Sequence, residues 1–277
     1  MVTEDIHRVQ EAQSLIREIN MGANAIGTGL NAHPDYARLV TEKLRLLTGI
    51  PVIGSENLVE ATQDTGAYVQ LSGVLKRVAT KLSKICNDLR LLASGPRAGL
   101  HEINLPVMAP GSTIMPGKVN PIVPEVVNQV AFEVIGNDIT VTLAAEAGQL
   151  ELNVMEPVIA YNLFTSLDML GRACRTLADR CVVGITANRE VCRWMVEHSI
   201  GLVIALNPYI GYEKSTQLAE EALKGGRSVY EIVLEKGDLS QAELDGILSP
   251  ENMTKPRHIY PKRLRNSSDN YRVRGGG

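Results

Sequence analysis

Aromatic residues are scarce in this sequence: they make up 4% of its 277 residues, whereas hydrophobic residues as a whole make up 44%. A core with so few rings must be built mainly from aliphatic side chains. Helices packed on one another suit that composition better than a β-sandwich, whose strands favour aromatic and β-branched residues. A chain of this length can bury one large core or two ordinary ones. The composition therefore favours an all-α fold.

Long apolar runs are also missing. No stretch of about 18 apolar residues occurs, so we expect no membrane-spanning helix. The N-terminal stretch MVTEDIHRVQEAQ is polar and contains no signal-peptide core. These two features favour a cytoplasmic protein.

Paired cysteines are absent too. The four cysteines, Cys86, Cys174, Cys181 and Cys192, form no Cys-x-x-Cys pair. Cys174 and Cys181 are seven residues apart, which places them on one face of a helix. This pattern indicates free, buried thiols in a reducing compartment rather than a zinc site. The five histidines are scattered without the spacing of metal ligands, so we expect no metal site.

Charge is unevenly distributed. The net charge is −3, but residues 255–277 hold seven Lys or Arg against one acid, so they carry +6 and the rest of the chain carries −9. We predict that residues 256–277 form a disordered basic tail. An acidic body without interleaved aromatic residues argues against nucleic-acid binding, so a solvated tail is the simpler interpretation.

The clearest helical pattern spans residues 74–95. Apolar residues recur there at alternating spacings of three and four, which is the heptad pattern of a long helix in a bundle. They are Leu75, Val78, Leu82, Ile85, Leu89 and Leu92. Gly95-Pro96 is expected to end this helix.

A second apolar run begins at Pro121. A row at helical spacing comprises Val123, Val127, Val130, Val134, Val141 and Ala145. Its β-branched residues would also suit a strand, but the spacing persists over about 25 residues, far beyond ordinary strand length. Other apolar residues lie off the row, namely Val126, Ala131 and Ile135. We therefore expect a central helix that is buried on most of its sides.

The character of the chain changes near residue 187. Residues 1–187 contain the long runs, including an opening helix with Ile6, Val9, Leu15 and Ile19 on one face. We expect them to form a central helical bundle domain that is incomplete at its N-terminus, because the chain opens inside a helical pattern. Residues 188–255 have the pattern of a small helical C-terminal domain.

Short helices are expected in that second domain. SVYE at 228–231 and SQAE at 240–243 both have the sequence of a capping box. Asn207-Pro208 and Gly225-Gly226 separate the helices.

Two glycine-containing loops are candidate ligand sites. GANAIGTG, residues 22–29, lacks the Lys-Ser/Thr ending of a phosphate-binding loop and follows a helix, so we interpret it as a close-packed helix break. PGSTIMPGKVNPIVPE, residues 110–125, is a stiff connection with four prolines. Ser112, Thr113, Lys118 and Asn120 add hydroxyls, a cation and an amide just before a helix start. That set suits binding of a small carboxylate.

This second loop resembles the GSSxMPxKxNPxxxE signature of the aspartase/fumarase superfamily, with Thr113 in place of the usual second serine. The similarity covers residues 1–255. It continues through the stretches INMGANAIGTGLNA, KICNDLRLLASGPRAGLHEINLP, VVNQVAFEVIGNDITVTLAAEAGQLELNVMEPVIAYN and GITANREVC. PEVVNQVAFEVIGND and AAEAGQLELNVMEPV are more similar to the aspartase branch than to fumarases.

The resemblance implies a lyase that converts L-aspartate to fumarate and ammonia through an aci-carboxylate. By position in the signature, Ser112 is the catalytic base, and Lys118 and Asn120 bind the α-carboxylate of the substrate. Thr113 donates to the β-carboxylate, and Met115 packs near the substrate.

The resemblance further implies that Glu125 supports a histidine or glutamine of another subunit, within a homotetramer built on a bundle of long helices. No metal or organic cofactor is implied for the chemistry. Divalent cations activate some members of the family, but the sequence shows no site for one. Two other signature stretches of the family, which include the donors to the β-carboxylate, do not occur here. We therefore expect the chain to be inactive by itself.

Two alternatives stay open. One is a fumarate hydratase, which shares the loop signature. The other is a non-catalytic helical oligomerisation module that keeps the helices but performs no turnover. Ammonia release from L-aspartate and the mass in solution would separate the three hypotheses.

Overall fold

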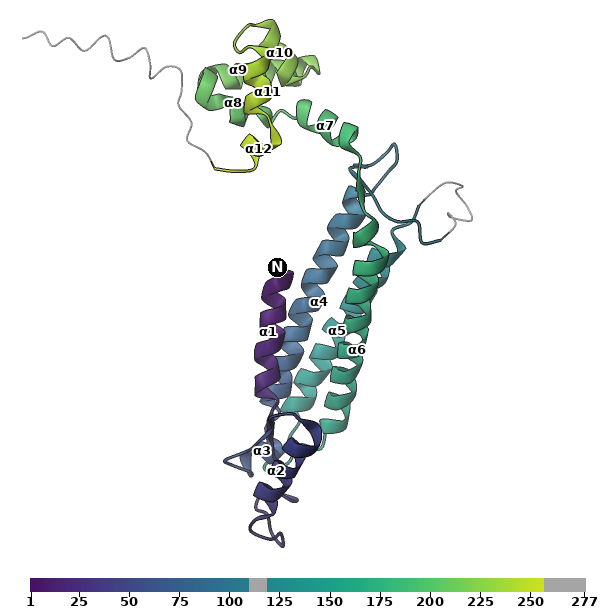
Figure 1. Cartoon of the computed structure of the whole chain (residues 1–277), viewed down its shortest axis with the longest axis vertical. Helices are drawn as coiled ribbons and strands as arrows, with labels where there is room; N and C mark the ends of the chain where they lie inside the picture. The colour runs from purple at the N-terminus through teal and green to yellow at the C-terminus, as the bar shows by residue number, and fades with distance from the viewer. Residues whose placement is uncertain (110–118, 257–277) are drawn as a thin grey trace, which may run out of the picture. The chain divides into compact units, whose positions relative to one another are not determined.

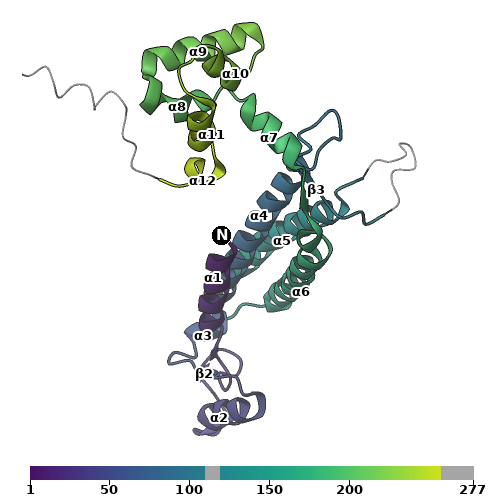
Figure 2. The same ribbon diagram turned by 45° about the horizontal axis from the view of Figure 1, so that its top comes forward.

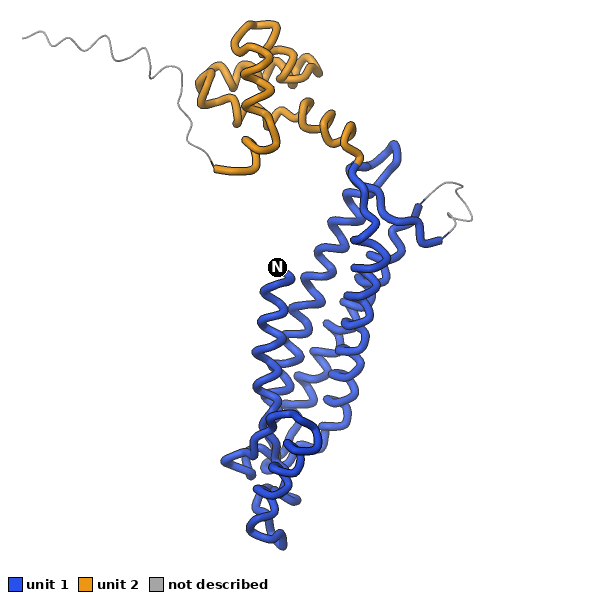
Figure 3. Tube along the Cα trace, in the orientation of Figure 1, with its two compact units in different colours: residues 1–187 blue, residues 188–277 orange. Residues whose placement is uncertain are grey.

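The computed structural model describes residues 1–109 and 119–256. The chain divides into two compact units, residues 1–187 and residues 188–277, drawn in blue and orange in Figure 3. Both units are helical, and the strands among the described residues are each two residues long. The fold class is therefore all-α, as the composition predicts. Most of the expected basic tail, residues 257–277, lies outside the described residues.

Four helices make up most of the first unit. They are α1 (Val2–Leu15), α4 (Gly66–Leu92), α5 (Ile122–Glu146) and α6 (Glu156–Arg180). Figures 1 and 2 both show α4, α5 and α6 side by side, and α5 packs against each of the other two. No helix within residues 1–109 and 119–256 combines the length and apolar content needed to span a membrane.

The buried seam of α4 differs slightly from the predicted heptad row. Leu75 and Leu82 are 4% and 8% exposed, as the row requires, but the seam continues through Ala79 and Cys86, which are completely buried. The other members of the predicted row flank this seam and are half-buried. The three-four spacing is therefore correct, and the seam is shifted toward small side chains, which let neighbouring helices approach closely.

The central helix α5 is buried on two sides. Val127, Val134 and Val141 are each 1% exposed and belong to the core that α5 shares with α4 and α6. Phe132 and Leu143, in contrast, are each 62% exposed. The expectation of burial on most sides is therefore right for the faces toward α4 and α6 and wrong, within this single chain, for a third face that is apolar and open.

The predicted apolar face of the opening helix is not its buried face. Ile6 is 53% exposed, and Ile19 lies beyond the helix, in the short strand β1 (Glu18–Ile19). The buried residues of α1 are instead Asp5 and Ala12. The error has a simple cause: the charges of this helix have partners on α4, so the charged side turns inward.

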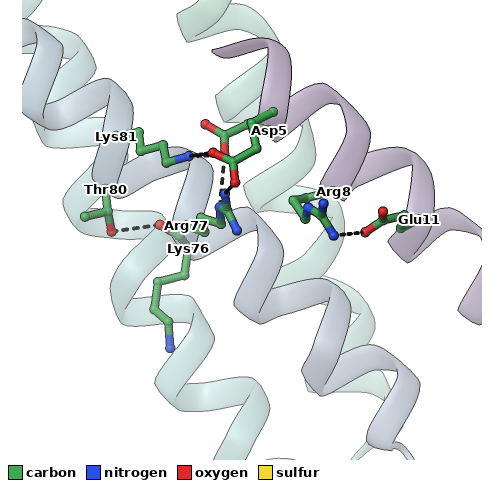
Figure 4. A network of polar contacts seen from close by, with 8 residues as sticks. Asp5, Arg8, Glu11, Lys76, Arg77, Thr80 and Lys81 are labelled. Carbon is green, nitrogen blue, oxygen red and sulfur yellow. Dashed lines mark hydrogen bonds and ion pairs between the residues drawn. The ribbon is translucent and has the colours of Figure 1, made fainter. Parts of the chain in front are cut away.

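Those partners form a compact ionic cluster, shown in Figure 4. The carboxylate of Asp5 lies 3.0 Å from Nε of Arg77 and 2.8 Å from Nζ of Lys81. Glu4 accepts from the same two cations at 2.7 and 3.1 Å. Hydrogen bonds from Arg77 and then Lys81 hold the pKa of Glu4 at about 2, well below its ordinary value. Ion pairs therefore hold α1 on α4, with little apolar burial.

A loop region with short elements follows α1. It contains α2 (Tyr36–Thr48), α3 (Glu60–Gln63) and the strand β2 (Ile53–Gly54), which pairs in parallel with β1. Gly22 and Gly27 have φ of 101° and 85°, and a Cβ on either would come within 2.7 Å or 2.2 Å of neighbouring atoms. The stretch 22–29 is thus a close-packed turn, in agreement with its interpretation from sequence.

The second unit is a cluster of short helices with its own core. They are α7 (Arg189–Glu197), α8 (Leu202–Ile210), α9 (Tyr212–Gly225), α10 (Val229–Glu235), α11 (Gln241–Ile247) and α12 (Pro250–Met253). Leu206, Ile232 and Leu244 are completely buried at the centre of this core.

One of the two predicted capping boxes forms. The Ser240 hydroxyl accepts from the Glu243 N–H at 3.4 Å, and the Glu243 carboxylate accepts from the Ser240 N–H at 3.0 Å. At the other, Ser228 accepts from the Tyr230 N–H and donates to the carbonyl of Glu197 at 2.7 Å. Ser228 therefore ties α10 to the end of α7 instead of closing a box.

The prediction of buried thiols holds for half of the cysteines. All four are free; Cys86 and Cys181 are buried, whereas Cys174 is exposed and Cys192 is partly so. Burial raises the pKa of Cys86 to about 11, so this thiol stays protonated at neutral pH.

Candidate active site

The candidate stretch, residues 110–125, ends in the first turn of α5. Four of the predicted site residues, Ser112, Thr113, Met115 and Lys118, lie outside the described residues. Asn120 and the later Glu125 are described, so the geometry of the site starts with them.

Asn120 is held by a tight turn at the head of α5. Its carbonyl accepts from the N–H of Ile122 at 2.9 Å, across Pro121 with φ −78° and ψ 56°. These angles are those of an inverse γ-turn. Because the proline ring fixes φ, the half-buried Asn120 has little freedom to move independently of the helix.

Glu125 occupies the first turn of α5. Its N–H donates to the carbonyl of Pro121 at 3.1 Å, and the residue is half-buried. A carboxylate is favourable there because the N-terminus of a helix carries partial positive charge. Glu125 and Asn120 therefore lie at the same end of the same helix, one in its first turn and one just before it.

A cavity of about 270 Å³ lies beside this helix head. It is bounded by the end of α4 and the turn after it, including Ala93 and Gly95, and by Val119 and Pro121. The strand β3 (Ile103–Asn104) forms another wall, and it pairs with β4 (Thr186–Ala187) in antiparallel register. His101, the histidine nearest the loop in sequence, also lines the cavity and has a positive φ of 49°.

The described side chains around the loop do not amount to a metal centre. Within residues 1–109 and 119–256, no group of three or more His, Cys, Asp or Glu side chains is arranged to hold a metal ion.

One buried polar residue near the site, Asn128, was not predicted from the sequence. Asn128 on α5 is 3% exposed and contacts Ser83, Asn87 and Arg90 on α4. A possible signal was its place among the valines of α5, because a buried amide at such a position needs specific partners.

The chain matches two protein-family models. Residues 1–136 match the model described as Lyase, and residues 202–255 match the one described as Fumarase C C-terminus. It is 63% identical over 262 residues to the aspartate ammonia-lyase of Helicobacter pylori, covering 95% of this chain and 56% of the relative. It is 55% identical over 258 residues to the aspartate ammonia-lyase of Escherichia coli K12, covering 93% of this chain and 54% of the relative.

Solved structures also superpose on the chain. A fumarate lyase:delta crystallin from Brucella melitensis, bound to cobalt, superposes with a TM-score of 0.88 at 53% identity, covering 92% of this chain and 55% of that one. A class II fumarase from Schistosoma mansoni superposes with a TM-score of 0.81 at 35% identity, covering 92% and 57%.

The chain thus spans about 55% of the length of the curated relatives that it matches. Nearly all of it aligns with them, the two matched family models occupy its two units, and its helical architecture superposes on theirs. This chain belongs to the aspartase/fumarase superfamily.

Proposed function

We propose that the chain is part of an aspartate ammonia-lyase, which converts L-aspartate to fumarate and ammonia. The observation that carries this proposal is the 63% identity to the Helicobacter pylori enzyme over 95% of the chain. The loop at residues 110–125 adds the chemistry, because its residues match the superfamily signature.

The chemistry starts at a C–H bond that is barely acidic. Ser112, as the alkoxide, takes the proton from the carbon beside the β-carboxylate and becomes a hydroxyl. The electron pair moves into that carboxylate to give the aci-carboxylate form. When it returns to form the C=C bond, the C–N bond breaks and ammonia leaves.

The loop residues meet the charge demands of these steps. Lys118 and Asn120 bind the α-carboxylate, and Thr113 donates to the β-carboxylate, whose charge increases in the transition state. Donors fixed in advance at such a point can each contribute about 2.7–4 kcal/mol. Met115 packs beside the substrate.

Glu125 has a different role in this proposal. It supports a histidine or glutamine supplied by another subunit of a homotetramer. The open apolar face of α5, with Phe132 and Leu143 exposed, favours such an assembly because leaving apolar surface in water is unfavourable.

The elimination needs no organic cofactor or metal in this proposal, and activation by a divalent cation is a separate property to be tested by titration. We place the protein in the cytoplasm, in keeping with its four free cysteines. Its partners are L-aspartate, fumarate and further copies of the chain, not nucleic acid or membrane.

Two candidate functions compete with this one. A fumarate hydratase is favoured by the superposition on the Schistosoma mansoni fumarase. A non-catalytic oligomerisation module is favoured by the open apolar face of α5, which carries Phe132 and Leu143. The isolated chain should be inactive or nearly so under all three hypotheses. The family's other donors to the β-carboxylate belong to signature stretches that do not occur in these 277 residues.

One experiment separates the three candidates. The 277-residue chain, and a chimera in which the N-terminal part of the Helicobacter pylori enzyme precedes it, are assayed with L-aspartate and with fumarate. We expect ammonia and fumarate from L-aspartate in the chimera only. Malate from fumarate without ammonia release would favour the hydratase, and a folded, oligomeric but inert chimera would favour the module.

A further inference from the structure

A buried amide joins the head of α5 to the end of α4. The Nδ2 group of Asn128 lies 2.9 Å from Oγ of Ser83, 3.1 Å from its carbonyl oxygen and 3.1 Å from Oδ1 of Asn87. Its Oδ1 accepts from Nη1 of Arg90 at 3.3 Å. One side chain, 3% exposed, therefore contacts three residues of the neighbouring helix.

These contacts fix the position of the head of α5 along α4, which apolar contacts alone do not determine. Ser83, Asn87 and Arg90 follow one another at spacings of four and three, so they form one row along the last turns of α4. Beside them Val123 and Val127 of α5 belong to the apolar core, and apolar burial has no directional preference. Another polar link between the two helices, from Asp138 to Ser72 and Lys76, lies ten residues further along α5. Hydrogen bonds are directional, so a sliding of α5 along α4 would break them.

The anchor lies close to the candidate substrate residues. Asn128 is one helical turn beyond Glu125, and it lies six residues into α5, about 9 Å along its axis. Asn120 follows the helix head through the γ-turn at Pro121, whose φ is fixed by its ring. A shift or tilt of this helix head would therefore carry Asn120 and Glu125 with it.

We propose that Asn128 is a positioning residue, which through Ser83, Asn87 and Arg90 holds the head of α5 in the register that Asn120 and Glu125 require. This inference rests on the proposed function for its catalytic consequence, but the anchoring can be measured without turnover. It assigns a role to a residue outside the loop signature.

The same helix supplies a matched control. Asn137 is also buried, at 9% exposed, and its Nδ2 donates to Oγ of Ser166 on α6 at 3.2 Å. It lies nine residues further along α5, away from the head. Asn137→Ala therefore removes a buried asparagine from α5 without touching the anchor to α4.

The first measurement uses amide hydrogen exchange on the whole 277-residue chain. Asn128→Ala should speed exchange by at least tenfold in a peptide covering residues 122–128 and leave one covering residues 139–146 unchanged. Asn137→Ala should not affect the first peptide. Unchanged protection of residues 122–128 in Asn128→Ala would overturn the proposal.

The second measurement is steady-state kinetics in the chimera with the Helicobacter pylori N-terminal part. Asn128→Ala should raise KM for L-aspartate by at least tenfold, because it displaces Asn120, which binds the α-carboxylate of the substrate. Asn137→Ala should change KM by less than twofold. A merely structural loss would lower kcat by reducing the active fraction and leave KM unchanged, and that result would also overturn the proposal.

A further variant covers the case in which Asn128→Ala fails to fold. Asn128→Asp keeps the shape and the acceptor for Arg90 but removes the donors to Ser83 and Asn87, and it should change exchange and KM in the same direction. Wild-type values of both in a folded Asn128→Asp would overturn the proposal. If the unsubstituted chimera releases no ammonia, the proposed function fails, and hydrogen exchange alone decides whether Asn128 anchors the helix.

Discussion

Lys76 on α4 lies 2.5 Å from the carboxylate of Asp138 on α5, and this ion pair links two helices of the bundle through a carboxylate that is only 6% exposed. The hydroxyl of Ser72 donates to the other oxygen of the same carboxylate at 2.8 Å. Asp138 is thus a buried charge with two partners, both on α4. Removing either would leave part of that charge without compensation.

Lys76→Met should therefore destabilise the first unit. The variant keeps most of the aliphatic stem and removes the cation, so we expect a loss of about 1–3 kcal/mol, the cost of leaving a buried polar group without its partner. Urea denaturation followed by circular dichroism measures it.

A surface pair on α6 provides the control for Lys76→Met. Arg172 lies 2.9 Å from Asp168, but both side chains are more than half exposed. Arg172→Met should cost about 0–1 kcal/mol. Equal effects of the two variants would show that the Lys76 pair behaves as a surface pair.

The sequence predicts the long helices because their signal is local. The three-four spacing from Leu75 to Leu92 indicates α4 without knowledge of any other part of the chain. Ser240 and Glu243 likewise form their capping box within a single turn. The close-packed turn at Gly22 could also be anticipated, because it follows from residues next to one another.

The sequence could not predict features that depend on distant partners. Asp5 is buried because Arg77 and Lys81, more than 70 residues away, meet it on α4. A pattern that ranks residues by hydropathy places such a carboxylate outside. The role of Asn128 could not be predicted for the same reason, because its partners are on another helix. The roles of Ser112 and Lys118 remain predictions.

The ionic cluster between α1 and α4 should make the protein sensitive to acid. The pKa of Glu4 is about 2 in the folded chain, below its ordinary value of 4.5. Its stabilising contribution is thus present above pH 4.5 and is lost as the pH falls toward 2. We expect Glu4→Gln to have a lower unfolding midpoint than the unsubstituted chain at pH 7, with a difference that shrinks over that range.

Melting curves at several pH values test the role of Glu4. Glu11→Gln is the control, because Glu11 pairs with Arg8 on the same helix and both side chains are exposed. A difference for Glu4→Gln that stays constant from pH 7 to pH 2 would contradict the assignment.

The two units should unfold separately when one core is damaged. Leu244 is completely buried in the second unit, and Leu244→Ala should destabilise that unit by about 2–5 kcal/mol. Amide hydrogen exchange in a peptide covering residues 229–247, which spans α10 and α11, reports on that unit.

Leu75→Ala is the counterpart in the first unit, where Leu75 is 4% exposed. It should speed amide exchange in the long helices of the first unit and leave exchange in residues 229–247 unchanged. Equal acceleration of exchange in both units in either variant would mean that the two cores unfold as one.

Ser112→Ala should remove most of kcat in a chimera completed with the Helicobacter pylori N-terminal part. The reason is the proposed role as base, since a positioned general base typically contributes about 10²–10⁴-fold. KM for L-aspartate should change little, because Lys118 and Asn120 still bind the α-carboxylate. Ser94→Ala, in the turn after α4, is a control for loss of a loop hydroxyl. Retention of more than about a tenth of kcat by Ser112→Ala would refute its assignment as the base.

The open apolar face of α5 should make the chain associate. Ile139 is 59% exposed and Leu143 is 62% exposed, on the side of the helix that carries Phe132. Covering such surface gains about 25 cal/mol per Å², so a second copy that brings the same face has a strong tendency to bind. Ile139→Asp would place a charge in that contact, where desolvation opposes burial.

We expect light scattering after size-exclusion chromatography to give a mass above one chain for the unsubstituted protein and a smaller mass for Ile139→Asp. Gln217→Asp adds the same charge on an exposed polar site of the second unit and should leave the mass unchanged. A monomeric unsubstituted chain at micromolar concentration would show that this face is tolerated in water, and the argument for assembly through α5 would fail.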